Sequence, residues 1–208
     1  WLLATLGVAN LVLEKFDLAR RYYQRAVDFA KRRIGDITSM RRNVELLREV
    51  VDVPDELLAV FNYGGVIVFS GHMLDHPHRV SQQGLATRFP ADPVLERAVA
   101  DEIGRELDLL NPAIGYSSCA NGADILFCEQ MMKRGKELNI VLPFDLEDFY
   151  LTSVDLGIDQ RRRWRERCDA ILDHASVHYA TRERYLGDPI LFDFTNRVMQ
   201  GLAILRAR

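Results

Sequence analysis

The chain has 208 residues, of which 48% are hydrophobic and 27% are charged, as is typical of a globular protein with one or two domains. Its formal net charge is only -3, so the basic surface that nucleic-acid binding requires is not indicated. The longest apolar runs fall far short of the roughly 20 residues that span a bilayer, so neither a membrane segment nor a signal peptide is predicted.

The N-terminal part, residues 1–61, predicts a helical segment. Apolar and small residues recur every three or four positions over 2–13 and 16–30, which indicates two amphipathic helices joined by a tight turn. Connector helices are expected over 37–51 and 54–61. The chain begins at Trp1 within the first helical pattern, which predicts that it is a piece of a longer protein.

This helical pattern resembles one tetratricopeptide repeat. Leu6-Gly7, Ala19, Tyr23 and Ala26 occupy positions that the repeat consensus fills with Leu-Gly, Ala, an aromatic residue and Ala. A single repeat cannot bury its own hydrophobic face, so further repeats and a protein partner are expected to contact these helices.

A second domain is predicted over residues 66–208, after a boundary at Asn62-Tyr63-Gly64-Gly65. Strand and helix patterns alternate from there on. Strands are expected at 66–70, 114–119, 140–144 and 177–180, and helices at 92–110, 123–138, 159–174 and from 190 onward. This alternation predicts an α/β fold with a Rossmann-like, doubly wound parallel sheet. Because the pattern stops on a helix, a fifth strand is expected beyond Arg208.

The first candidate site follows the first strand. Its loop runs to Phe89-Pro90, and a loop of about 20 residues is uncommon in a compact domain unless it is functional or disordered. Its cations, carboxylate and imidazole suit a ligand that carries phosphate or ribose. The candidate residues are Ser70, Gly71, His72, Asp75, Arg79 and Arg88. Alternatively, the glycine serves a turn, the aspartate caps it and the arginines are solvated.

The second candidate site is the loop from Ser117 to Asp124, between the second strand and its helix. Ser117 and Ser118 offer hydroxyl groups, and Gly122 permits close approach to the backbone. The amide groups of Ala123 and Asp124 begin a helix whose dipole favours an anion. The Asp124 carboxylate either caps this helix or accepts hydrogen bonds from ribose hydroxyls.

Three further groups have alternative interpretations. Glu129 lies about 140° around the helix from Asp124, so these two carboxylates do not form an acid/base pair by helical geometry. His72, Asp75, His76 and His78 include metal-ligating residue types, but their spacing fits no known site and no metal is predicted. In the run 161–167, Trp164 is assigned to the core side of a helix and the arginines largely to its solvent face, with phosphate binding as the alternative.

The three cysteines indicate the compartment. Cys119, Cys128 and Cys168 are odd in number and lack Cys-x-x-Cys spacing. This favours a reducing compartment, and a cytoplasmic location is therefore expected. Cys119 lies near the second candidate site, but a buried cysteine is usually inert packing.

Five short signals in the second domain together resemble the SLOG superfamily of Rossmann-like domains, which is related to the DNA-processing protein DprA and the Lonely Guy hydrolases. They are Ser70-Gly71-His72, Gly122-Ala123-Asp124 with Glu129, Leu142-Pro143-Phe144, Trp164 with Asp169-Ala170-Ile171-Leu172, and Asn196-Arg197. The resemblance covers residues 66–208.

The resemblance implies a sensor domain that binds a nucleotide or nucleotide-derived metabolite within a larger bacterial signalling protein. Glu129, Pro143 and Phe144 would then join the site. The Lonely Guy hydrolases carry a Pro-Gly-Gly-x-Gly-Thr loop where this chain has Cys119 to Asp124, which favours sensing over catalysis. Two alternatives stay open: hydrolysis of an N-glycosidic or phosphate bond with Asp124 or Glu129 as the acid/base group, and a protein-interaction scaffold. No particular cofactor is indicated.

Overall fold

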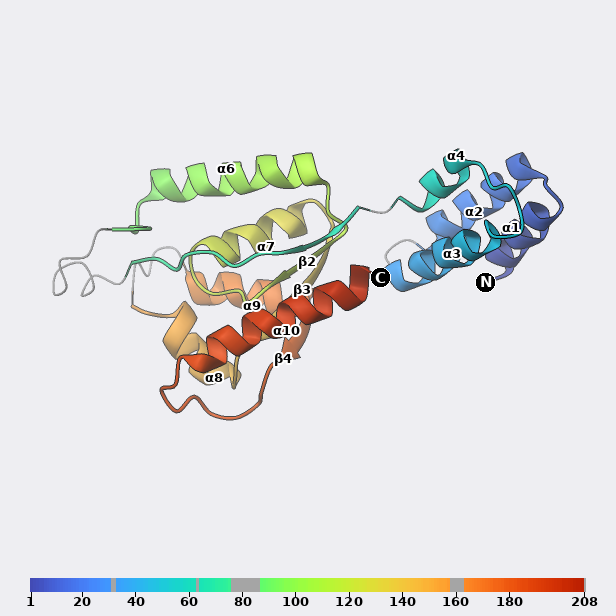
Figure 1. The fold of residues 1–208 in the computed structure, drawn as a ribbon. Coiled ribbons are helices and arrows are strands. Elements are labelled where there is room, and N and C mark those ends of the chain that lie inside the picture. Colours follow the sequence, from blue (N-terminus) through green and yellow to red (C-terminus); the bar gives the residue numbers. More distant parts are fainter. Residues whose placement is uncertain (31–32, 63, 76–86, 158–162, 208) are drawn as a thin grey trace. The chain divides into compact units, whose positions relative to one another are not determined.

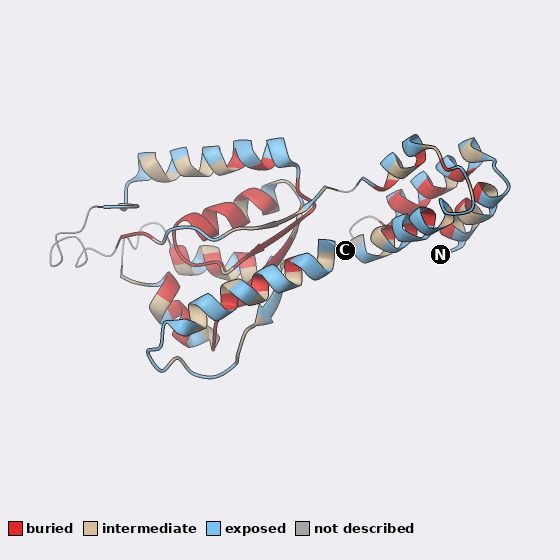
Figure 2. Ribbon diagram, viewed as in Figure 1, coloured by how far each residue is buried: buried red, intermediate tan, exposed pale blue. Residues whose placement is uncertain are grey.

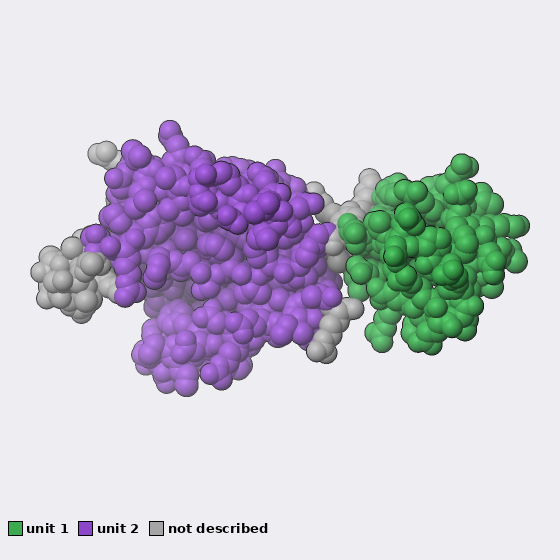
Figure 3. All heavy atoms as spheres, turned by 45° about the horizontal axis from the view of Figure 1, so that its top comes forward, with its two compact units in different colours: residues 1–63, 208 green, residues 64–207 purple. Residues whose placement is uncertain are grey.

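The computed structural model describes residues 1–30, 33–62, 64–75, 87–157 and 163–207. The chain divides into two compact units, shown separately in Figure 3: a helical unit of residues 1–63 with residue 208, and an α/β unit of residues 64–207. The division falls within the stretch Asn62 to Gly65, where the glycine pair ends the helical pattern.

The helical unit consists of helices around a mainly aliphatic core that includes Tyr23 and Phe61. Its elements are α1 (Leu2–Val12), α2 (Phe16–Ala30), α3 (Ile34–Leu47), α4 (Asp55–Leu58) and the 3-10 turn η1 (Ala59–Phe61). Tyr23 packs edge-on against Phe61, with ring centroids 4.9 Å apart. A Cβ on Gly7 would come within 2.9 Å of the Tyr23 ring, so the glycine lets α1 approach α2 closely. Two helices joined by a tight turn are therefore confirmed, and the tetratricopeptide resemblance stays a prediction.

The α/β unit is built on a four-stranded sheet (Figure 1). The strands are β1 (Val66–Val68), β2 (Ile114–Ser117), β3 (Glu137–Leu142) and β4 (Ser176–Tyr179). All neighbouring strands are parallel, in the order β1-β2-β3-β4. The predicted parallel α/β sheet is therefore confirmed.

Helices cover both faces of this sheet. The long helices are α6 (Pro93–Leu110), α7 (Ala123–Lys133), α9 (Trp164–His174) and α10 (Ile190–Ala207), and the short turns α8 (Leu146–Phe149) and η2 (Tyr150–Val154) follow β3. On one face, α7 packs on β2 and β3 and is flanked by α6 and α9. On the other, α10 contacts β1, β2 and β3, and its Arg206 pairs with Glu137 at 2.7 Å.

The sequential strand order differs from the doubly wound arrangement that the sequence predicts. The connections through α6, α7 and α9 lead from each strand to its next neighbour, and the described strands show no reversal of direction. The unit therefore matches a Rossmann-like layering of helices on both faces, but its described strands wind in one direction only.

Local signals explain where the helices begin and end. Asp92 caps α6, because its carboxylate accepts a hydrogen bond from the Val94 amide at 2.7 Å. The end of α7 was predicted at Leu138, which is wrong: the helix stops at Lys133, since Gly135 has a left-handed backbone with φ of 61°. Strand β3 consequently begins at Glu137, three residues earlier than expected.

Candidate functional site

The two predicted loops meet where β1 and β2 end. The Gly71 amide donates a hydrogen bond to Oδ1 of Asp124 at 2.7 Å, and the Ala123 amide donates to the His72 carbonyl at 3.0 Å. We call residues 70–75 the β1 strap, because this segment crosses the start of α7. The Ala123 amide, which the sequence assigned to an anionic ligand, is therefore already bonded to the strap.

Gly122 makes the close contact between the strap and α7. Its φ is +86°, and a Cβ at this position would lie 2.7 Å from the His72 carbonyl oxygen. Only glycine combines this backbone conformation with so near a neighbour. The sequence predicted that a ligand would lie close to the Gly122 backbone, but the strap backbone takes that place in the structure.

Asn121 is a site residue that the sequence interpretation missed. This buried side chain accepts from the Leu74 amide at 3.1 Å and donates to the Val154 carbonyl at 3.1 Å. The backbone amide of Asn121 donates to the Ser153 carbonyl at 2.8 Å. Asn121 therefore ties the β1 strap and the end of η2 to the loop after β2. The available signal was a polar residue directly before a glycine, inside an otherwise small and apolar stretch.

Asp124 is buried beneath the strap, where its carboxylate accepts the Gly71 hydrogen bond; Figure 2 shows that most of α7 is buried. Burial raises the pKa of Asp124 to about 7, although hydrogen bonds from the Gly71 and Ala120 backbone oppose the shift. The carboxylate therefore joins the strap to α7 and changes its charge near neutral pH.

Asp75 closes the base of the long loop. Its Oδ2 accepts hydrogen bonds from the amides of Arg88 and Phe89 at 2.7 and 2.8 Å, and its own amide donates to the Phe89 carbonyl at 2.8 Å. Arg79 lies outside the described residues, and the Arg88 side chain is exposed. The structure thus supports a turn-capping role for Asp75.

The end of β2 and the loop that follows it hold two unusual residues, Ser117 and Cys119. Ser117 is fully buried, and its Oγ has no hydrogen-bond partner among the described residues. The Oγ of Ser118 lies 3.8 Å from the sulfur of Met199. Cys119 has a φ of +67°, a conformation that non-glycine residues seldom adopt. Strain and unpaired polar groups of this kind concentrate at functional sites.

Pro143 and Phe144, at the end of β3, are buried in the protein interior. The Phe144 ring stacks on Tyr185 with centroids 4.6 Å apart, and Phe192 packs edge-on against it at 5.5 Å. Asp148 holds the covering segment in place, since it accepts from the Tyr185 amide at 2.8 Å. The Phe144 side chain is therefore covered by protein and presents no free surface to a ligand.

Glu129 faces neighbouring helices, away from the loop after β2. Arg167 of α9 binds both of its carboxylate oxygens, at 2.7 and 2.8 Å, and also donates to Glu96 of α6 at 2.9 Å. The same guanidinium lies 4.2 Å from the Trp164 ring centroid. The sequence placed the arginines of this run largely on the solvent face, and Arg167 is an exception because it clamps three helices together.

We expect Arg167→Ala to lower the free energy of unfolding of the α/β unit by about 2 kcal/mol, because two half-buried carboxylates lose a cation. Urea unfolding followed by circular dichroism measures this change. Arg105→Ala is a suitable control, since Arg105 forms an exposed pair with Glu102 on α6 and such pairs contribute about 0 to 1 kcal/mol. Equal losses in the two variants would contradict a clamp at Arg167.

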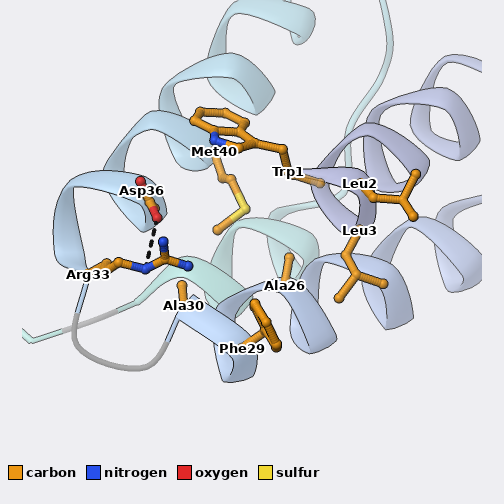
Figure 4. Close-up of a pocket in the computed structure, with 10 residues that line it drawn as sticks. Trp1, Leu2, Leu3, Ala26, Phe29, Ala30, Arg33, Asp36 and Met40 are labelled. Carbon is orange, nitrogen blue, oxygen red and sulfur yellow. Dashed lines mark ion pairs between the residues drawn. The ribbon is translucent and has the colours of Figure 1, made fainter.

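Two cavities lie elsewhere. One of about 400 Å³ lies among α1, α2 and α3, with Trp1, Leu3, Phe29 and Met40 in its lining and the Arg33–Asp36 ion pair beside it (Figure 4). The other, of about 440 Å³, lies between β4 and α10 and is lined in part by His178, Arg182 and Leu202.

Among the described residues, no group of three or more His, Cys, Asp and Glu side chains has a metal-binding arrangement. His76 and His78 lie outside the described ranges, in the gap between residues 75 and 87. Of the helices in those ranges, none is long and apolar enough to cross a membrane.

No protein-family model matches this chain, and no curated protein matches it either. The resemblances to the SLOG superfamily and to a tetratricopeptide repeat therefore rest on the sequence signals alone.

Proposed function

We propose that the α/β unit senses a nucleotide or a nucleotide-derived metabolite at the carboxyl ends of β1 and β2. The observation that carries the proposal is the buried Asp124 carboxylate, which links the β1 strap to the start of α7. Ser117, whose hydroxyl has no hydrogen-bond partner among the described residues, is the last residue of β2, and the left-handed Cys119 lies in the loop that leads to Asp124. A titrating carboxylate, an unpaired polar group and backbone strain between Ser117 and Asp124 support a ligand site.

The strap supplies a means of reporting that the site is occupied. A phosphate bound at the start of α7 would take the Ala123 hydrogen bond that the His72 carbonyl now accepts. The strap would then move away from α7, and the Gly71 to Asp124 hydrogen bond would break.

Isothermal titration calorimetry with purine nucleotides, cyclic nucleotides and NAD derivatives tests the proposal. We expect at least one compound to bind the folded chain, and we expect Asp124→Asn to strengthen its binding by removing a negative charge beside the phosphate. Arg105→Ala should leave the affinity unchanged. If no compound in any of the three classes binds the folded chain, the proposal is wrong.

A protein-interaction scaffold is the second candidate, and two observations favour it. The Phe144 ring is covered by Tyr185, and backbone of the strap covers Gly122. In the helical unit, Leu2 and Phe29 beside the cavity are 75% and 74% exposed, a surface suited to an apolar partner. If the chain is a scaffold, calorimetric titrations with nucleotides should show no heat of binding. A protein should bind the helical unit instead, and Phe29→Glu should abolish that binding.

Hydrolysis has less support in the geometry. Glu129 is held by Arg167, and Asp124 accepts hydrogen bonds from the backbone beneath the strap. Incubation with nucleoside monophosphates, followed by chromatography, separates this activity from sensing. A free base or free phosphate that appears with the chain and disappears with Asp124→Asn would support hydrolysis.

A further inference from the structure

Two buried thiols from different elements lie in contact beside the candidate site. Cys119 belongs to the loop after β2, and Cys168 lies in the middle of α9. Their sulfur atoms are 3.5 Å apart, and the Cys168 thiol also lies 3.7 Å from the Cys119 carbonyl oxygen. Both residues are fully buried. The contact joins positions 49 residues apart in sequence, so the fold rather than the local chain brings the thiols together.

The sulfur atoms are close enough to be joined by a small movement. A disulfide bond is about 2.05 Å long, so the atoms need to approach by about 1.5 Å, which side-chain rotation and a slight loop shift can supply. The loop is the element suited to move, because Cys119 holds the left-handed backbone. Helix α9 is anchored by the Arg167 pairs and provides the fixed partner.

We propose that Cys119 and Cys168 are a reversible redox pair, which a peroxide oxidises to an intramolecular disulfide. The Cys119 sulfur attacks the O–O bond of the peroxide, which breaks to give a sulfenic acid and, when hydrogen peroxide is the oxidant, one water. The Cys168 sulfur then displaces the hydroxyl group of that sulfenic acid, which takes up the thiol proton and leaves as a second water. Two thiols thereby lose two electrons and two protons, the peroxide is reduced, and a dithiol reverses the change.

Burial controls how readily the pair reacts. Burial and the neighbouring thiols of Cys128 and Cys168 raise the pKa of Cys119 well above its usual range, so the reactive thiolate is scarce while the loop is closed. Oxidation therefore requires a local opening of the loop. In a reducing compartment such a bond is transient and regulatory.

The bond would tether the loop that carries Asn121 and Gly122 to α9. This consequence rests on the proposed function, since a tethered loop would hold the ligand site in one state. The chemistry of the pair does not depend on it. A disulfide that forms in a chain without nucleotide binding would support the redox pair and refute the sensor.

The test oxidises the folded full chain with hydrogen peroxide, blocks remaining thiols with iodoacetamide under denaturing conditions, and measures the intact mass. We expect one alkylated cysteine instead of three, an intact mass about 2 Da below that of a singly alkylated reduced chain because two hydrogens are lost, and a peptide that links Cys119 to Cys168. Dithiothreitol should restore three alkylated cysteines. The Cys128→Ser variant should form the same bond, whereas Cys168→Ala and Cys168→Ser should not.

Three results would overturn the proposal: three alkylated cysteines after oxidation, oxygen added to Cys119 without a link, or a link through Cys128. Circular dichroism verifies that each variant is folded. Since the intact mass and the linked peptide of the wild-type chain together distinguish these outcomes, the test stands even if a variant does not fold.

Discussion

Replacing Gly122 with alanine should lower the free energy of unfolding of the α/β unit by roughly 3 to 4 kcal/mol. The new Cβ would lie 2.7 Å from the His72 carbonyl oxygen and 3.0 Å from the Leu74 amide nitrogen, both backbone atoms that cannot rotate away. The φ of +86° adds conformational strain. Urea unfolding followed by tryptophan fluorescence measures the loss, since Trp164 is buried in the α/β unit and Trp1 is largely exposed.

The matched control is Gly187→Ala. Gly187 also has a positive φ, of +90°, but no atom lies near its added Cβ. Its substitution should therefore cost only the conformational part, about 1 kcal/mol. If both variants lose the same stability, the strap does not press on Gly122 as the structure indicates.

The buried Asp124 should make the α/β unit less stable as the pH rises. Its pKa is about 7 in the folded chain and 3.8 without the protein environment. The folded state therefore binds the proton more tightly, and stability falls between about pH 4 and pH 7. A shift of this size corresponds to a loss of roughly 4 kcal/mol. The pKa values of Asp108 and Asp148 are lowered, so the protonation of these two carboxylates affects stability only below this pH range.

Two variants isolate this effect. Asp124→Asn keeps an oxygen that accepts from the Gly71 amide but carries no charge, so its stability should stay level where that of the wild type declines. Asp124→Ala also loses the acceptor and should be less stable than Asp124→Asn by about 1 to 3 kcal/mol at every pH. Urea titrations at several pH values measure both. A wild-type curve parallel to that of Asp124→Asn would show that Asp124 does not titrate in this range.

Much of the α/β unit could be predicted from the sequence because its signals are local. Alternating apolar runs and helical stripes located the four strands, and Asp92 marked the start of α6. The predicted end of α7 was wrong because Gly135 was overlooked as a stop signal. The strand order was beyond reach, because the order of parallel strands depends on how distant segments pack.

The candidate site could be predicted in part for the same reason. Loops that follow neighbouring parallel strands meet at one edge, and so the meeting of Gly71 with Asp124 could be expected. The hydrogen bond from the Ala123 amide to the His72 carbonyl joins two backbone groups, so no side chain in the sequence indicates it. The pairing of Glu129 with Arg167 joins residues 38 positions apart, which helical spacing within α7 does not reveal.

The hydrogen bonds around Asp75 give the α/β unit a place where chain length can change. The carboxylate and backbone of Asp75 bind both Arg88 and Phe89, so the two ends of the intervening segment are fixed to each other independently of what lies between them. Lengthening a closed loop adds little entropic penalty, about 0.6 kcal/mol for each doubling. A change in the number of residues between Asp75 and Arg88 should therefore leave the contacts that fix these two ends, and the sheet, in place.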